Sequence, residues 1–154
     1  MDDLDAGKTL ALRILGGRDL SAKALEKRLV SKGTSEETAS KTVDWLKEIG
    51  LINDAEHACS IVRHYHVKGY GLARIKAELF RREIARDVWD DALLVLDDAA
   101  TEDTALHFLE KKLRGSRERN DLRRAEDALV RRGFNYEEAR EAINKYLEIQ
   151  DDPD

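Results

Sequence analysis

The chain has 154 residues, of which 38% are charged and 42% are hydrophobic. Its single cysteine, Cys59, excludes a disulfide framework and a zinc site built from several cysteines. No uncharged run is long enough to cross a membrane, and the acidic amino terminus lacks the apolar core of a secretory signal. We therefore expect a cytoplasmic protein with no membrane attachment.

The net charge of −5 is distributed unevenly along the chain. Residues 61–90 carry seven basic and four acidic side chains, and residues 111–133 carry nine basic and four acidic ones. Such patterning indicates basic patches on an acidic body. Solvated helix faces whose cations are balanced by nearby acids would give the same composition, so both interpretations stay open.

No segment alternates apolar and polar residues as a strand would, and glycines mark the ends of the apolar-periodic segments. Thr34, Asn53 and Asn135 each stand three residues before a glutamate, which is the spacing of a helix N-cap. In chain order, the pattern predicts helices at 6–15, 21–32 and 36–48, at 54–67, 72–82 and 86–97, and at 102–114, 120–132 and 136–148.

A period of fifty residues relates these helices in three groups. Leu29, Leu79 and Leu129 correspond and are predicted to be buried, while Gly33 and Gly133 share a slot that the middle group fills with Glu83. We predict an all-α fold, a tandem array of three three-helix repeats that resemble helix-turn-helix units. Their predicted ranges are 1–50, 51–100 and 101–149, followed by an acidic tail at 150–154.

The sequence lacks the motifs of common catalytic and cofactor sites. No Walker loop, nucleophile elbow or dinucleotide fingerprint occurs. His64 and His66 are two residues apart, so a helix would point them in different directions and they make a poor metal-chelating pair. Cys59 is interpreted as a small buried hydrophobic residue, and the stretch from Lys68 to Gly71 as a turn between helices. We expect no enzymatic activity, no metal and no cofactor.

Basic residues of the second helices are the candidates for binding. Arg74 and Arg81 correspond to Arg124 and Arg131 in the fifty-residue period, so the same helix face is basic in two repeats. Arginine forks suit phosphate or carboxylate groups. The candidate partner- or nucleic-acid-binding residues are Arg63, Lys68, Arg74, Lys76, Arg81 and Arg82 in the middle repeat, and Arg114, Arg117, Arg119, Arg123 and Arg124 in the last.

The third helices are acidic, which disfavours sequence-specific recognition of duplex DNA through them, because their carboxylates would face phosphates. Tyr65 and Tyr70 offer rings on which unpaired bases could stack. Phe80 is expected to face the core.

The stretch Gly50-Leu-Ile-Asn-Asp-Ala-Glu-His-Ala58 resembles a junction of the bacterial RecX regulatory proteins, and the spacing of the residues after it matches the same family. Those residues are Arg63, Lys68-Gly-Tyr-Gly71, Ile75 and Glu78-Leu79; upstream, Ala11-Leu12, Leu15, Ser21, Leu25, Leu29 and Lys32-Gly33 resemble the first repeat of the family. The likeness covers about residues 6–148. Two departures are Arg82-Glu83, where the family has Lys-Gly, and His57, where it usually has an aromatic residue.

The resemblance implies an elongated, curved array of three-helix modules that acts without catalysis. It implies binding to the RecA recombinase and its filament on single-stranded DNA, with inhibition of filament growth, ATP hydrolysis and strand exchange. We expect a monomer, with DNA itself as a second candidate partner. Two other functions stay open: an autonomous single-stranded nucleic-acid-binding protein, and a helical-repeat scaffold for an unrelated protein.

Overall fold

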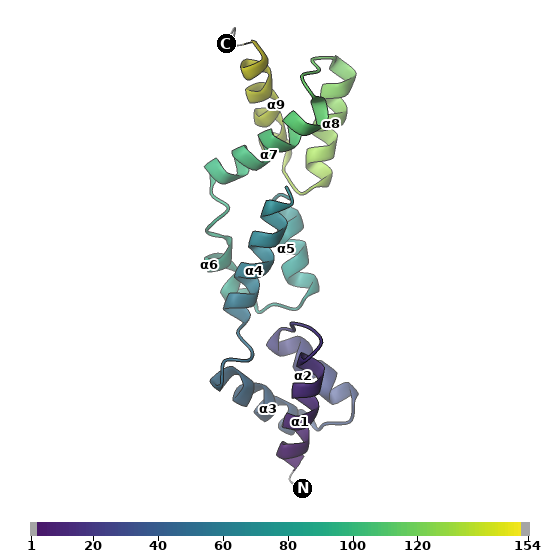
Figure 1. Ribbon diagram of the computed structural model, residues 1–154, viewed down its shortest axis with the longest axis vertical. Coiled ribbons are helices and arrows are strands. Elements are labelled where there is room, and N and C mark those ends of the chain that lie inside the picture. Colours follow the sequence, from purple (N-terminus) through teal and green to yellow (C-terminus); the bar gives the residue numbers. More distant parts are fainter. Residues whose placement is uncertain (1–2, 152–154) are drawn as a thin grey trace. The chain divides into compact units, whose positions relative to one another are not determined.

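The computed structural model describes residues 3–151. These residues form nine α helices and one short 3-10 helix, with no strand among them (Figure 1), so the predicted all-α fold is confirmed. The helices are α1 (Asp3–Leu15), α2 (Ala22–Ser31), α3 (Glu36–Glu48), α4 (Asp54–Val67), α5 (Leu72–Arg81), η1 (Arg86–Val88), α6 (Trp89–Leu93), α7 (Asp98–Leu113), α8 (Arg119–Arg131) and α9 (Tyr136–Asp151). Over the described range, none has the length and apolar character needed to cross a membrane.

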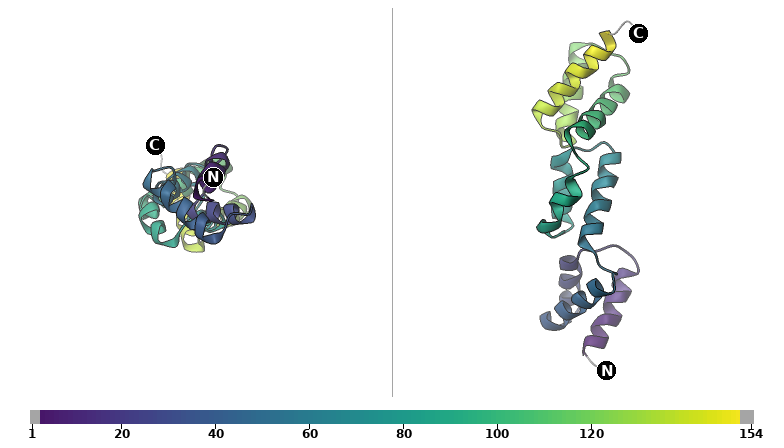
Figure 2. Two further views of the ribbon diagram at one scale, coloured as in Figure 1. Left: turned by 90° about the horizontal axis from the view of Figure 1, so that it is seen from below. Right: turned by 90° about the vertical axis from the view of Figure 1, so that its left-hand side faces the viewer.

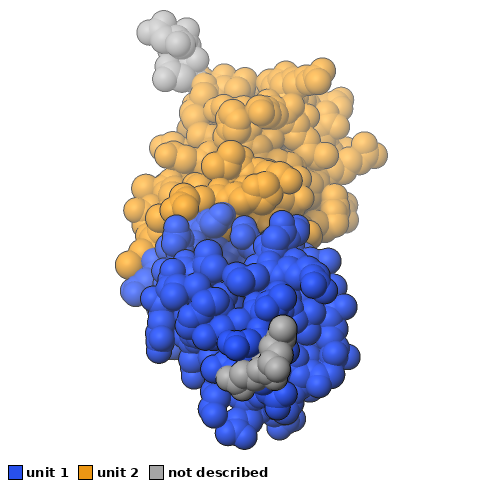
Figure 3. Space-filling model, turned by 60° about the horizontal axis from the view of Figure 1, so that its bottom comes forward, with its two compact units in different colours: residues 1–60, 79–92 blue, residues 61–78, 93–154 orange. Residues whose placement is uncertain are grey.

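The chain divides into two compact units, which Figure 3 colours separately. Unit 1 consists of residues 1–60 and 79–92, and unit 2 consists of residues 61–78 and 93–154. Helices α1–α3 belong to unit 1 and α7–α9 to unit 2, while α4 and α5 each contribute residues to both units. Residues 152–154 of the predicted acidic tail lie outside the described residues.

In unit 1, the helices α1, α2 and α3 pack around a core that includes Leu25, Val43 and Leu46. The helices come close together where α1 carries Gly7. A Cβ atom at this position would lie 2.8 Å from the Thr42 hydroxyl oxygen, so the missing side chain permits the close approach of α1 to α3.

In unit 2, α7, α8 and α9 enclose a second core, and the right-hand view of Figure 2 shows this three-helix bundle from another side. Leu109, Phe134 and Tyr146 are buried in it. The Tyr146 hydroxyl donates a hydrogen bond of 3.0 Å to the carbonyl oxygen of Ser116. The polar end of this large side chain is therefore satisfied, and the ring can be fully buried.

Corresponding positions of the three helix groups have corresponding environments. Leu29, Leu79 and Leu129 are each 0% exposed, so their predicted burial is confirmed. All three lie near the end of the second helix of their group. The fifty-residue period in the sequence is therefore matched by a period in the packing.

The slot after each second helix has a left-handed backbone in all three groups. Gly33 and Gly133 have φ values of 103° and 104°, and Glu83 in the middle group has a φ of 58°. A side chain makes this conformation less favourable, because its Cβ crowds the backbone. Glu83 nevertheless adopts it, and its carboxylate pairs with the ammonium group of Lys27 within unit 1.

The helix predicted at 86–97 is present, but its predicted end is wrong, because helical structure stops at Leu93. The backbone forms the short helix η1, continues as α6 and leaves the helical conformation after Leu93. Asp97 explains the difference, because it is extended, with φ −69° and ψ 174°, and its carboxylate accepts a 2.8 Å hydrogen bond from the Ala100 amide. It is thus the N-cap of α7, which begins at Asp98 instead of the predicted residue 102.

Two of the three predicted N-caps are confirmed. Asn53 accepts from the Glu56 amide at 3.1 Å, and Asn135 and Glu138 cap each other's backbone amides at 2.7 and 2.8 Å. Thr34 is not a cap. The cap of α3 is Ser35, whose hydroxyl accepts from the amide three residues later.

Two expectations about burial are wrong. Phe80 is 72% exposed, because the buried stripe of α5 runs through Ile75 and Leu79 and the next residue is turned about 100° away from it. Cys59 is half-buried instead of buried.

Candidate partner-binding surfaces

Ten of the eleven candidate basic residues are exposed, and Arg82 is half-buried. The two units share them unequally. Unit 1 contains Arg81 and Arg82, while unit 2 contains Arg63, Lys68, Arg74, Lys76, Arg114, Arg117, Arg119, Arg123 and Arg124.

Arg74 is the candidate of α5 with the most described contacts. It lies in the first turn of the helix, its guanidinium is 4.0 Å from the Glu78 carboxylate, and it lies over the Tyr70 ring at 5.0 Å from the centroid. Because Glu78 is buried, its negative charge is poorly screened and offsets part of the charge of Arg74. Lys76 and Arg81 are exposed on the same helix.

The candidates of the last repeat follow one continuous segment, from the end of α7 into the second turn of α8. Arg114 has a left-handed backbone, with a φ of 50°, and ends α7. Arg117 is committed to an ion pair with Asp151. Arg119, Arg123 and Arg124 are exposed on α8, and the structure gives them no acidic partner among the described side chains.

The turn from Lys68 to Gly71 lies between α4 and α5, as predicted, and contacts the turn between α8 and α9 within unit 2. The Gly71 amide donates to the carbonyl oxygen of Arg132 at 2.8 Å, and the Ala73 amide donates to that of Gly133 at 3.1 Å. These amides stand at the start of α5, where a helix supplies no partner of its own.

Only glycine fits on either side of this contact. A Cβ atom on Gly71 would lie 2.5 Å from the carbonyl carbon of Gly133, and one on Gly133 would lie 2.6 Å from the Arg74 amide nitrogen. Both distances are to backbone atoms, which cannot turn aside as a flexible side chain can. The two turns are therefore in direct backbone contact.

Arg132 fixes the same contact from its side chain. Its Nε donates to the carbonyl oxygen of Gly69 at 3.2 Å and its Nη2 to that of Lys68 at 2.7 Å. The guanidinium lies over the rings of Tyr70 and Phe108, at 4.4 and 5.0 Å from their centroids. Arg132 is not among the candidates chosen from the sequence. The fifty-residue period could have identified it, because a basic residue stands at this position in every repeat.

A related arrangement occurs in unit 1, where the turn between α1 and α2 meets residues 81–83. Arg18, Asp19, His57, Arg81, Arg82 and Glu83 line a hollow there. Its three arginines face two acids, so most of the arginine charge of this hollow is balanced.

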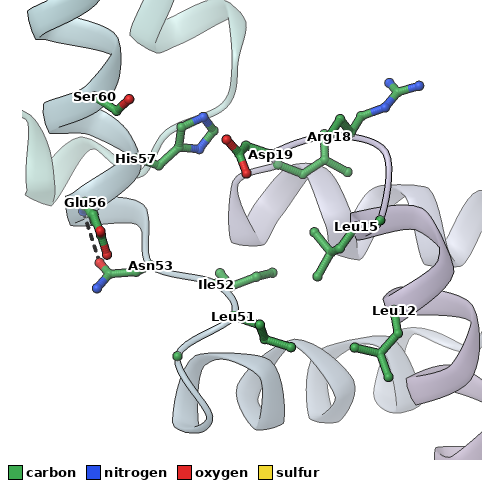
Figure 4. A pocket seen from close by; sticks show the side chains of 13 residues that line it. Leu12, Leu15, Arg18, Asp19, Leu51, Ile52, Asn53, Glu56, His57 and Ser60 are labelled. Carbon is green, nitrogen blue, oxygen red and sulfur yellow. Dashed lines mark hydrogen bonds between the residues drawn. The ribbon is translucent and has the colours of Figure 1, made fainter.

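His57 has an environment that disfavours its charged form. Burial lowers its pKa below the ordinary value of 6.5, and Arg82 lowers it further, while Asp19 and Asp54 act in the opposite direction. Figure 4 shows the imidazole directed toward the Asp19 carboxylate. The Nδ1 atom of His57 is buried and has no hydrogen-bond partner among the described groups.

A groove with one apolar side lies beside this histidine in unit 1, and Arg18, Asp19 and Glu56 are among its polar lining residues. Leu12, Leu15, Leu51 and Ile52 gather on one side of it in Figure 4, and its volume is about 530 Å³. Leu12 and Leu51 are exposed. Exposed apolar side chains in a groove are typical of protein contact surfaces.

Two family models match the chain. RecX, second three-helix domain, matches residues 53–93, and RecX, first three-helix domain, matches residues 8–46. The matched segments include most residues of α1–α3 and of α4–α6.

Known relatives match over nearly the whole chain. Regulatory protein RecX of Mycolicibacterium smegmatis is 31% identical over 93% of this chain and 80% of the relative, and that of Streptomyces coelicolor is 31% identical over 96% and 80%. The crystal structure of RecX from Lactobacillus salivarius superimposes with a TM-score of 0.85 at 26% identity, covering 96% of this chain and 98% of the other. These relatives are named as regulatory proteins, and the chain, like them, is no enzyme.

Proposed function

The chain belongs to the RecX family of regulatory proteins, and from this premise we propose that it binds the RecA recombinase. The proposed target is the RecA filament on single-stranded DNA. Binding would inhibit filament growth, ATP hydrolysis and strand exchange. We further propose that the protein acts as a cytoplasmic monomer organised as three repeats, at 1–50, 51–100 and 101–149.

The observation that supports this proposal is the unequal charge of the helices within each group. Exposed arginines lie on α5 and α8, the second helices, at Arg74, Arg81, Arg123 and Arg124. The third helices α3 and α9 begin with pairs of acidic residues and are acidic along their exposed faces. A filament on DNA presents phosphates and charged protein surface together, so a protein with separate basic and acidic faces is suited to contact it.

The first experiment titrates the protein into the single-strand-dependent ATPase reaction of RecA and measures its affinity for bare DNA in the same buffer. Inhibition at protein amounts far below those that coat the DNA supports direct action on the filament. Inhibition only at saturation of the bare strand would mean competition for DNA, and no inhibition would refute the proposal.

A charge-reversal variant tests the basic face of α5. Arg74→Glu combined with Arg81→Glu is expected to weaken filament binding by about tenfold, or 1.4 kcal/mol, because each reversal replaces an attraction by a repulsion. Lys47→Glu combined with Lys145→Glu is the matched control, since it changes the net charge equally but on the exposed faces of α3 and α9. Circular dichroism checks that both variants keep their helices. Equal affinity of the two variants would exclude this face.

A further inference from the structure

Unit 2 contains a hollow of about 780 Å³ between the end of α4 and one face of α7. Its basic side chains are Lys68, Lys111, Lys112 and Arg132. Among the described residues that line it, Asp103 is the one acid. Of the four cations only Lys68 stands among the candidates chosen from the sequence, so this hollow is a separate surface.

The geometry of α7 directs its residues into the hollow. Asp103, His107 and Lys111 follow one another at intervals of four, as do Thr104, Phe108 and Lys112, and residues so spaced share a helix face. From the other side, His66 of α4 lies 3.4 Å from the Thr104 hydroxyl. Val67 on the rim is 84% exposed, so the hollow is open to solvent there.

The fifty-residue period supplies an internal comparison with the hollow of unit 1. Arg18, His57 and Arg82 of that hollow correspond to Lys68, His107 and Arg132. The acids of unit 1, Asp19 and Glu83, correspond to Gly69 and Gly133, and the buried Ile61 and Val62 correspond to Lys111 and Lys112. The hollow of unit 2 therefore has glycines where the hollow of unit 1 has its two acids, and it has two lysines where the preceding period has buried apolar residues.

Helix dipoles account for part of this charge but not all of it. The cations lie at the carboxyl ends of α4, α7 and α8, and each such end carries about half a negative charge. Four cations and one carboxylate give a formal charge of +3. Subtracting about 1.5 for the three helix ends leaves about +1.5, which suits one or two singly charged phosphodiesters.

We propose that this hollow binds phosphates of a single nucleic-acid strand. The ammonium groups of Lys111 and Lys112 bind phosphate oxygens directly. The guanidinium of Arg132 already donates to two carbonyl oxygens, so it contributes through its positive charge at longer range. His66 and His107 provide rings for adjacent bases. The site deepens the proposed function, on which it rests, by assigning a DNA contact to unit 2.

The test measures binding of labelled oligothymidylate by fluorescence anisotropy over a range of salt concentrations, without RecA. Each lost contact to a single-strand phosphate reduces the slope of log affinity against log salt by about 0.7. Lys111→Gln combined with Lys112→Gln is expected to reduce it by about 1.4. Lys47→Gln combined with Lys145→Gln, which changes the net charge equally, should leave the slope unchanged. Equal slopes for the two variants would overturn the proposal.

Two further arms separate the sources of the anion. Oligothymidylate added to isotope-labelled protein should shift the backbone amide resonances of residues 66–69 and 107–112, and shifts confined to other segments would overturn the site. Competition by polyglutamate, or by inorganic phosphate at constant ionic strength, as effective per charge as the oligonucleotide would assign the hollow to another anion. The RecA reaction is independent of this result. If the lysine variant has a reduced slope and still inhibits the ATPase, the proposal of RecA binding stands. If the wild-type protein binds DNA at this hollow without inhibiting RecA, only the proposal of RecA inhibition is refuted.

Discussion

Gly71→Ala tests the direct backbone contact between the two turns of unit 2. The added Cβ would lie 2.5–2.6 Å from the carbonyl group of Gly133 and the amide nitrogen of Phe134, whereas carbon atoms in contact prefer about 3.5–4.0 Å. The turns must therefore separate by about 1 Å. That movement stretches the 2.8 and 3.1 Å hydrogen bonds of the Gly71 and Ala73 amides beyond useful length.

The magnitude follows from these two effects. Overpacking costs about 1–3 kcal/mol when the contact is kept, and two lost hydrogen bonds cost about 0.5–1.5 kcal/mol each when it is released. Since both limits come to about 1–3 kcal/mol and the structure relaxes between them, we expect Gly71→Ala to lower the free energy of unfolding by about 1–3 kcal/mol.

Urea denaturation followed by circular dichroism measures the change, and hydrogen exchange at the Ala73 amide localises it to this contact. Gly17→Ala is the control, because a Cβ there meets nothing within 4 Å and its backbone is not left-handed. It should be neutral or stabilise by up to about 1 kcal/mol. If Gly71→Ala stays within about 0.5 kcal/mol of wild type, the contact does not hold the turns together.

Three further predictions concern packing, hydrogen bonding and pH. Leu29→Ala, Leu79→Ala and Leu129→Ala should each cost about 2–5 kcal/mol in a denaturant melt, because each side chain is fully buried; a change below about 0.5 kcal/mol would contradict the packing. Arg132→Lys should cost about 1–2 kcal/mol in the same melt, because an ammonium group cannot reproduce the fork between two carbonyl oxygens; unchanged stability would show that these bonds do not secure the turn. His57 has a lower pKa when folded than its ordinary 6.5, so the unfolded chain takes up its proton first as the pH falls. Its stabilising contribution is complete above about pH 6.5 and is lost as the pH drops through the folded pKa. Thermal melts from neutral to mildly acidic pH should show a smaller loss for His57→Gln than for wild type, and equal losses would refute the assignment.

Local chemistry explains why most helix bounds could be predicted from the sequence. Asn53 and Asn135 cap the following turn with their own side chains, and Gly33 and Gly133 adopt the left-handed backbone for which glycine is the preferred residue. Such signals lie within a few residues of the helix end that they determine. Where two neighbouring residues could both cap a helix, the sequence alone does not decide between them. Thr34 was the predicted cap of α3, and Ser35 is the observed one.

The surfaces were less predictable because they depend on residues far apart in the chain. Gly71 and Gly133 each have the composition of an ordinary turn, and only the folded chain brings their backbones together. Lys111 and Lys112 likewise have the composition of an ordinary helix end, and the hollow needs α4 and Arg132 as well. The fifty-residue recurrence of basic residues identified only α5 and α8 as candidate binding helices, because such a recurrence reveals the charged face of a single helix and not a surface shared by several.

The sequence repeats and the compact units are out of phase, and this constrains how the protein can be cut or extended. A deletion of residues 51–100 would remove residues 51–60 and 79–92 from one unit and 61–78 and 93–100 from the other, although it excises one complete period. Fragments ending at a period boundary should therefore be incomplete folding units. Growth of such a chain by duplication would have to insert a whole period. The new copy would then contain both a turn equivalent to residues 68–71 and a turn equivalent to the one between α8 and α9.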